Sequence, residues 1–195
     1  MDITEVILSD HHEQRRMFAM LDDVDRSDIK TLTVLWNRLS AMLEVHAQAE
    51  ELFFYPELLA LGRRLRDDSE AEETKDAIGD HNDIRDGVHA AEAHTVGTPE
   101  WWAAVTQARE ANDEHMAEEE REGIADFRAN APAGLREALG RQFARFFEQH
   151  PTTDGVNVSD KNPERYVETI ERDIVQTREG DGSLGIGSLK GQRRL

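Results

Sequence analysis

Apolar residues recur every three or four positions along most of the chain, which is the spacing that places side chains on one face of an α-helix. Short stretches rich in Asp, Ser, Gly and Pro interrupt this pattern where helices are expected to end and begin. The pattern predicts helices over residues 2–24, 28–65, 70–94, 99–129, 133–149 and 163–178. Four long helices joined by short turns predict an all-α fold, namely an up-down-up-down four-helix bundle with one or two extra C-terminal helices.

The same pattern predicts how the chain is divided. Residues 1–130 would form the bundle, and residues 131–178 would form a C-terminal helical extension packed on it. The glycine-rich residues 179–195 would be a disordered tail. The extension has an apolar face that would either cover the bundle or form a dimer surface, and this face carries Phe143, Phe146 and Phe147.

Composition narrows the partners and the chemistry. The formal net charge is −18 at pH 7, so the protein should repel nucleic acids and anionic membrane surfaces, and we expect neither as a partner. The chain contains no cysteine, which excludes disulfides and thiolate ligands and fits a reducing cytoplasm. The first residues, MDITEVILSDHHEQ, lack the basic start and the long apolar run of a signal peptide or a membrane span. We therefore expect a cytoplasmic protein in which any metal is held by His, Asp, Glu or Tyr.

Polar residues interrupt the apolar faces of all four long helices. Each helix has a histidine on the face that should point to the bundle axis, and two helices add a glutamate four residues later, about 6 Å along the same face. These residues are His11, then His46 and Glu50, then His81, then His115 and Glu119. The remaining histidines fall off these faces and are expected on the surface or in packing roles; they are His12, His89, His94 and His150.

The spacing of the histidines predicts that they share one layer of the bundle. In an antiparallel pair of helices, two residues lie at the same height when the turn falls midway between them. The midpoint of His11 and His46 falls beside the DRSD turn, and the midpoint of His81 and His115 falls within GTPE. The midpoint of Glu50 and His81 falls at the start of RDDSE. The layer would therefore hold four imidazoles and two carboxylates.

A buried layer of this kind needs a compensating partner. One buried histidine is usually a core residue with a hydrogen bond, but six uncompensated polar groups would cost more than the roughly 5–15 kcal/mol by which a domain is stable. Metal coordination would offset that cost. Six nitrogen and oxygen ligands leave room for two ions that share the carboxylates, which disfavours a structural zinc site and suits iron better than manganese.

At this point the sequence resembles a known family. The pattern H-(x34)-HxxxE-(x30)-H-(x33)-HxxxE and the local sequences DHHEQRRMF, HAQAEELFFYPEL, DHNDIRDGV and HMAEEEREGI are similar to the hemerythrin-like, or HHE cation-binding, family over about residues 5–125. The resemblance implies a di-iron centre, that is, two iron ions with an oxo or hydroxo bridge. It also implies that Glu50 and Glu119 bridge the ions and that the four histidines are terminal ligands.

The sequence departs from the oxygen-carrying members of that family at two positions. Those proteins have a second histidine four residues after the one on the third helix, where this chain has Arg85. They end in HxxxxD, where this chain has HxxxE with Glu120 in the fifth position. Members linked to iron–sulfur repair show the same reduced set. The resemblance therefore argues against simple reversible oxygen carriage and implies that one iron keeps an open position.

Three nearby side chains have alternative roles around that position. Tyr55 is a candidate additional ligand, favoured if Pro56 kinks the second helix, or else a packing tyrosine whose hydroxyl finds a polar partner. Arg85 and Glu120 are candidates for the shell around the ligands. Arg85 would pair with Glu51 or Glu120, or extend to the surface.

These features predict a non-heme di-iron protein that binds and reacts with dioxygen, peroxide or nitric oxide at the open iron position. As an enzyme it would decompose peroxide as a catalase does, or reduce nitric oxide, in a stress response. The alternative is a non-catalytic sensor or binding protein for oxygen, nitric oxide or iron. A third interpretation, a plain acidic bundle with structural histidines, is disfavoured by the register. The sequence leaves open the catalytic residues, the physiological ligand, the role of the C-terminal helices and the oligomeric state.

Overall fold

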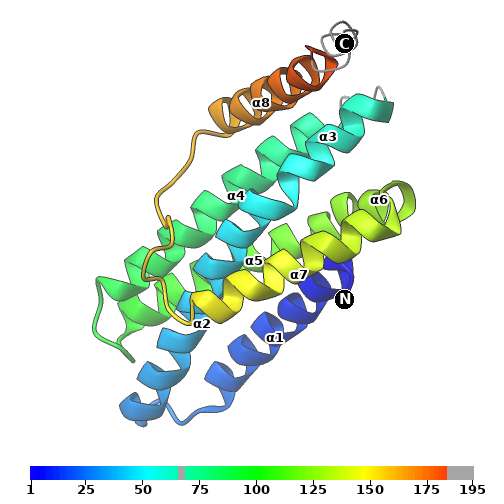
Figure 1. The fold of residues 1–195 in the computed structure, drawn as a ribbon. Coiled ribbons are helices and arrows are strands. Elements are labelled where there is room, and N and C mark those ends of the chain that lie inside the picture. Colours follow the sequence, from blue (N-terminus) through cyan, green and yellow to red (C-terminus); the bar gives the residue numbers. More distant parts are fainter. Residues whose placement is uncertain (66–68, 184–195) are drawn as a thin grey trace, which may run out of the picture.

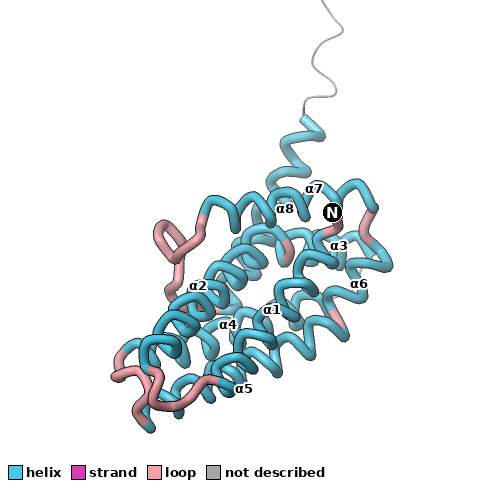
Figure 2. The backbone as a smooth tube through the Cα atoms, turned by 90° about the horizontal axis from the view of Figure 1, so that it is seen from below, coloured by secondary structure: helices cyan, strands magenta, loops and turns pink. Residues whose placement is uncertain are grey.

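The structure is a computed structural model that describes residues 1–65 and 69–183 (Figure 1). Every regular element in this described part is an α-helix. The helices are α1 (Ile3–Asp23), α2 (Ile29–Phe53), α3 (Tyr55–Leu65), α4 (Ser69–Glu92), α5 (Pro99–Arg121), α6 (Gly123–Asn130), α7 (Ala133–Gln149) and α8 (Pro163–Ser183). Helices α1, α2, α4 and α5 form the bundle, and the other four extend or cover it (Figure 2). The predicted all-α bundle with additional C-terminal helices is confirmed.

Local sequence determines where the bundle helices begin. Asp2 precedes α1, and its carboxylate accepts a hydrogen bond from the backbone N–H of Thr4 at 3.0 Å. Asp28 does the same for α2 with the N–H of Thr31, at 3.1 Å. Thr98 precedes α5, and its hydroxyl oxygen accepts a hydrogen bond from the backbone N–H of Trp101 at 3.3 Å. Such side chains satisfy N–H groups that the first turn of a helix leaves unpaired, so they fix the start of each helix.

The second expected helix consists of two helices, α2 and α3, because the chain bends at Phe54. Pro56 has no N–H to donate to the carbonyl four residues before it, and its ring crowds that carbonyl. The helix is therefore interrupted two residues before this proline. The bend turns Tyr55 into the bundle, where the residue is 1% exposed.

The expected helix over 99–129 also consists of two helices, α5 and α6, so the prediction of one continuous helix was wrong. The backbone of Glu122 leaves the helical region, with φ −111° and ψ −88°. Gly123 follows, and a Cβ atom there would lie 2.5 Å from Oε1 of Glu73 on α4. The break therefore lies directly beside α4, and the periodicity of apolar residues contains no information on this neighbour.

Two apolar cores lie on either side of a polar layer in the middle of the bundle. At the end formed by the α1–α2 and α4–α5 turns, Trp36 and Trp101 pack edge to face with ring centroids 5.8 Å apart. At the opposite end, side chains from α3, α6 and α7 join the core, among them Leu58, Phe127 and Phe143. Burial of these side chains stabilises the helix contacts on both sides and so holds the polar layer in place.

The two C-terminal helices lie on different sides of the bundle. Helix α7 packs on α1 and α2, and α8 packs on α4 and α3 (Figures 1 and 2). The phenylalanines of α7 face the bundle: Phe143 is fully buried, and Phe146 and Phe147 are partly buried against the same core. Of the two alternatives for this face, covering the bundle is the one observed.

Two expectations fall partly outside the described residues. Helix α8 runs to Ser183 instead of Arg178, so the expected boundary was too early. The rest of the expected disordered tail, residues 184–195, is not described, and neither are residues 66–68 of the RDDSE turn. Within the described ranges, no helix combines the length and the apolar composition that crossing a bilayer demands.

Candidate metal centre

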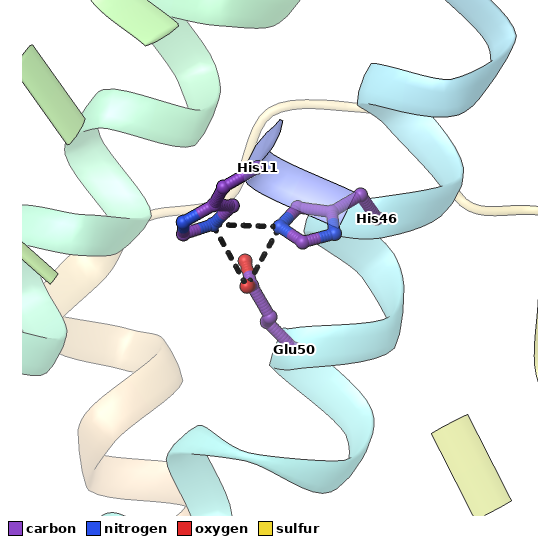
Figure 3. A group of neighbouring side chains, drawn as sticks. All are labelled: His11, His46 and Glu50. Atoms are coloured by element: carbon purple, nitrogen blue, oxygen red, sulfur yellow. Dashed lines mark hydrogen bonds and ion pairs between the residues drawn. The ribbon is translucent and has the colours of Figure 1, made fainter. Parts of the chain in front are cut away.

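The structure brings the six polar residues of the predicted layer together between α1, α2, α4 and α5. All six are buried, with at most 4% of any of them exposed. They are His11, His46, Glu50, His81, His115 and Glu119. Three of them, from α1 and α2, are drawn in Figure 3, where both imidazole rings point toward the carboxylate. The register predicted from the turn positions is therefore the register of the fold.

The histidines form two pairs, and each pair comes from one helical hairpin. Nε2 of His11 lies 3.2 Å from Nε2 of His46 on the α1–α2 hairpin. Nε2 of His81 lies 3.2 Å from Nε2 of His115 on the α4–α5 hairpin. Two nitrogen atoms that face each other at this distance are placed to share a proton or to bind the same cation.

Glu50 lies between the two histidine pairs. Its Oε1 is 2.8 Å from Nε2 of His46, and its Oε2 is 3.2 Å from Nε2 of His81. Within the described residues, Glu50 completes a three-residue group with each histidine pair, and the ligand atoms of each group lie within 4.8 Å of one another. One carboxylate therefore belongs to two candidate metal positions.

Glu119 enters the layer from α5 in a different way. Its Oε2 lies 3.4 Å from Nε2 of His11, and its Oε1 accepts a hydrogen bond of 2.7 Å from the hydroxyl of Tyr55. Burial, together with the negative charge of Glu119, raises the pKa of the Tyr55 hydroxyl well above its usual range. Tyr55 thus reaches the centre as a neutral hydrogen-bond donor. Its direct ligation of a metal, and a bridging role for Glu119, stay predictions.

Each of the four imidazoles also has a carboxylate beside the ring nitrogen that points away from the centre. The Nδ1–oxygen distances are 3.0 Å for His11–Glu120, 3.1 Å for His81–Glu51, 3.5 Å for His46–Asp10 and 3.5 Å for His115–Asp80. Carboxylates in this position favour a proton on Nδ1 and leave Nε2 free to bind a metal. Glu120 was predicted among the residues that surround the ligands. The others were missed there, although Asp-His occurs on both α1 and α4 and HxxxEE on both α2 and α5.

The two hairpins repeat one arrangement of charged residues around the centre. Four residues after the first histidine of each hairpin stands an arginine, and each arginine pairs with the outer glutamate of the other hairpin. Arg15 Nη1 lies 2.8 Å from Glu120, and Arg85 Nη2 lies 2.7 Å from Glu51. Of the three alternatives for Arg85, pairing with Glu51 is the one observed. Arg85 is fully buried and contacts Glu51, which lies beside Nδ1 of the candidate ligand His81.

The charges in the layer depend on one another. Burial lowers the pKa of His46, but the charge of Glu50 and the nearby Asp10 outweigh it and raise that pKa to about 10. Burial also opposes protonation of His115, where Asp80 and Glu50 raise the pKa to about 10. Burial lowers the pKa of His11 to about 4. At neutral pH, protonated His46 and His115 therefore balance carboxylate charge, and a metal that binds here must displace their protons.

The residues of the layer fit a pair of metal ions. Both carboxylate oxygens of Glu50 and Oε2 of Glu119 are buried, and the groups nearest to them are imidazoles of the same layer, so a cation that replaces the imidazole protons can bind each of them. Leaving such atoms unpaired is costly unless something binds them. Four imidazoles and two carboxylates match the ligand preferences of iron or manganese and differ from the closed, often thiolate-rich sites of structural zinc.

The other histidines do not enter the centre. His12 and His94 are exposed. His89 pairs with Glu44 at 3.1 Å, and Nδ1 of His150 lies 2.9 Å from the carbonyl oxygen of Phe146. The prediction that these four residues have surface or packing roles is consistent with these positions.

Comparison with known proteins identifies one family. The family described as Hemerythrin HHE cation binding domain matches residues 2–125, which is more than half of the chain and includes the whole polar layer and Tyr55. No curated protein and no solved structure gives a significant match.

Proposed function

The chain belongs to the hemerythrin HHE cation-binding family, and from this premise we propose that it is a cytoplasmic non-heme di-iron protein that binds and reacts with peroxide, dioxygen or nitric oxide. The observation that carries the proposal is the position of Glu50, whose two oxygens face different histidine pairs. A carboxylate in that position is suited to bind two ions at once.

In this proposal each hairpin supplies the nitrogen ligands of one iron. His11 and His46 would hold the first ion, and His81 and His115 would hold the second. Glu50 and Glu119 would bridge them. When bound, iron supplies redox chemistry and a coordination position at which a small molecule can bind.

The surrounding residues have separate tasks. The outer carboxylates, such as Glu51 beside His81, keep the imidazoles in the tautomer that presents Nε2. The Tyr55 hydroxyl, 2.7 Å from Glu119, holds a proton inside the centre and orients that carboxylate. Burial of the layer excludes bulk water, which strengthens these interactions.

Among the three substrates, hydrogen peroxide requires the least from outside the protein. Its decomposition converts two molecules of peroxide into two of water and one of dioxygen, so protons and electrons are redistributed without an external reductant. Reduction of nitric oxide would need electrons from a partner protein or cofactor. We therefore propose peroxide decomposition, in a stress response, as the primary activity.

Dioxygen evolution by the purified, iron-loaded protein tests this activity. The protein should evolve dioxygen from hydrogen peroxide over many turnovers, in a ratio of one dioxygen to two peroxides. The Glu50→Ala variant, loaded under the same conditions, should not. A parent protein that carries iron but gives no turnover would contradict the enzymatic proposal.

The alternative function, a sensor, is favoured by the contact between the centre and α8. Glu51, which supports His81, also pairs with Lys161 at 2.8 Å, and its backbone carbonyl accepts a hydrogen bond from the hydroxyl of Tyr166. A change at His81 would therefore reach the C-terminal segment directly. A stable oxygen or nitric oxide adduct without turnover, accompanied by altered hydrogen exchange in α8, would support this function over the enzyme.

A further inference from the structure

The metal centre is covered on two sides by the C-terminal extension. On the α1–α2 side, the rings of Phe143 and Phe147 lie against His46, with centroid distances of 5.8 Å and 6.4 Å. On the α2–α4 side, Lys161 and Tyr166 contact Glu51. The two apolar cores close the centre above and below. Ions and small molecules would therefore reach the centre from the side where α4 faces α5 and α6.

A cavity opens on that side and reaches the centre. Its inner wall is formed by Tyr55, His115 and Glu119, which belong to the layer or touch it. Its volume is about 30 Å³, which is room for about two water molecules. A cavity of this size has room for small inorganic species and is too small for an organic metabolite.

Carboxylates dominate the outer part of the cavity. Glu73 and Asp76 come from α4, and Glu118 and Glu122 come from α5 and the residue that follows it. No lysine or arginine lines the cavity, although Arg121 pairs with Glu122 at its rim, at 2.7 Å. The outer part of the cavity therefore carries a net negative charge.

Two buried oxygen atoms in the cavity wall accept no hydrogen bond within the described residues. They are Oε2 of Glu119, which lies 3.4 Å from Nε2 of His11, and Oε1 of Glu73. Glu119 is 4% exposed. Both atoms therefore have coordination capacity that a positive ion can use.

The position of Glu73 is also retained at a cost. Burial and the charges of Glu122 and Asp126 raise the pKa of Glu73 to about 7. Gly123 leaves the space that this carboxylate occupies, since a Cβ atom there would lie 2.5 Å from Glu73 Oε1. A half-buried carboxylate in a cavity, with its pKa raised by burial and by neighbouring charges, is typical of a functional position.

We propose that this cavity is the entrance to the metal centre, and that its carboxylates accelerate the entry of Fe²⁺ while slowing the entry of small anions. Dioxygen, nitric oxide and hydrogen peroxide are uncharged at neutral pH and pass without a barrier from these charges. A passage lined by charge of one sign, with low-dielectric walls, raises the local concentration of the opposite ion and speeds its arrival. The proposal rests on the di-iron function and adds the route and the charge selectivity.

The test compares three proteins with the same fold. The first is the parent. The second is Glu73→Gln/Asp76→Asn/Glu118→Gln, which neutralises three cavity carboxylates and leaves the ligands and Asp80 intact. The third is Glu110→Gln/Glu114→Gln/Glu137→Gln, which removes the same charge at exposed positions outside the cavity. The measurements are the rate of Fe²⁺ uptake by metal-free protein and the rate of azide binding to iron-loaded protein, both by stopped-flow absorbance.

The cavity variant should take up Fe²⁺ about tenfold more slowly than the parent at low ionic strength and should bind azide faster, because the two ions have opposite charge. The control variant should match the parent within about twofold, and 1 M salt should remove most of the difference. A damaged fold would slow both ligands, so the opposite directions identify the charge effect. If the cavity and control variants bound two irons at equilibrium but showed equal rates of Fe²⁺ uptake and azide binding, the proposal that this cavity is the entrance would be overturned. A parent that binds no iron would instead overturn the di-iron function itself.

Discussion

The hydroxyl of Tyr55 donates a hydrogen bond of 2.7 Å to Oε1 of Glu119, across the bundle from α3 to α5. This hydrogen bond is formed by the residue that directly follows the interruption between α2 and α3 at Phe54. The other hairpin has Ile124 at the corresponding distance from its HxxxE glutamate. The two otherwise repeated hairpins therefore differ at this point, beside the cavity that reaches His115.

Tyr55→Phe tests whether this tyrosine is a donor or a ligand. We expect the variant to bind as much iron as the parent and to lose about 1 kcal/mol of stability, the usual worth of one hydrogen bond. The spectrum of the parent should show no visible tyrosinate-to-iron band for the variant to lose. Loss of such a band together with one iron would show that Tyr55 is a ligand.

Adjacent histidines on α1 provide a matched pair of variants. His11 is fully buried and faces the centre, whereas His12 is exposed. His11→Ala should reduce iron affinity by more than the roughly 10–100-fold typical of losing an outer-shell residue, and His12→Ala should leave it unchanged. Glu50→Ala should release both ions, because its oxygens serve both positions. Iron titrations followed by elemental analysis provide the comparison, and equal iron content in all three variants would show that the layer is not the binding site.

The two arginines that pair with outer glutamates differ in burial, and this predicts different energetic effects. Arg85 is fully buried, whereas the side chain of Arg15 is 35% exposed. Arg85→Met removes one of the two cations that pair with Glu51, the other being Lys161, and should cost about 2–3 kcal/mol. Arg15→Met should cost less than about 1 kcal/mol. Denaturant unfolding of the metal-free proteins measures both values.

A double-mutant cycle separates the Arg85–Glu51 pair from the rest. Glu51→Gln combined with Arg85→Met should destabilise less than the sum of the two single variants, because no unpaired charge remains between them. Additive effects would mean that the pair does not act as a unit.

The stability of the protein should depend on Glu73 in the neutral pH range. The pKa of Glu73 is about 7 in the folded protein, above its ordinary value of 4.5, because of burial and the charges of Glu122, Asp126 and Glu70. The folded state thus binds this proton more tightly than the unfolded chain does. The resulting stabilisation is complete below about pH 4.5 and is lost as the pH rises through 7.

The substitution Glu73→Gln removes the loss of stability that the parent protein shows as the pH rises through 7. The variant should be more stable than the parent by about 1 kcal/mol at pH 8, a value reduced for solvent screening of a half-buried group, and should equal it near pH 4. Thermal unfolding across this range checks the prediction, with the exposed Glu110→Gln as control. A difference that does not change with pH would refute the electrostatic explanation.

The centre could be predicted from sequence because two simple regularities converge there. Helical periodicity identified the inward faces, and the turn positions brought His11, His46, His81 and His115 to one height. Both depend only on neighbouring residues and on chain length between turns, which a single sequence contains.

Other features depend on contacts between distant segments and were therefore missed. The break at Glu122 lies beside Glu73 of α4, which approaches Gly123. Lys161 lies in an irregular segment, without periodicity, yet its backbone exchanges hydrogen bonds with the side chain of Asn82 at 2.8 Å and 2.9 Å. No local pattern predicts either contact.

The most direct measurement is the metal content of the purified protein, determined by elemental analysis alongside its absorption spectrum. The two ligand groups that share Glu50 predict about two iron ions per chain and near-ultraviolet absorption from an oxo-bridged pair. Replacing Glu50 should remove both signals together. A fully folded protein that binds neither iron nor manganese, under conditions that supply both, would contradict the assignment of this layer as a metal centre.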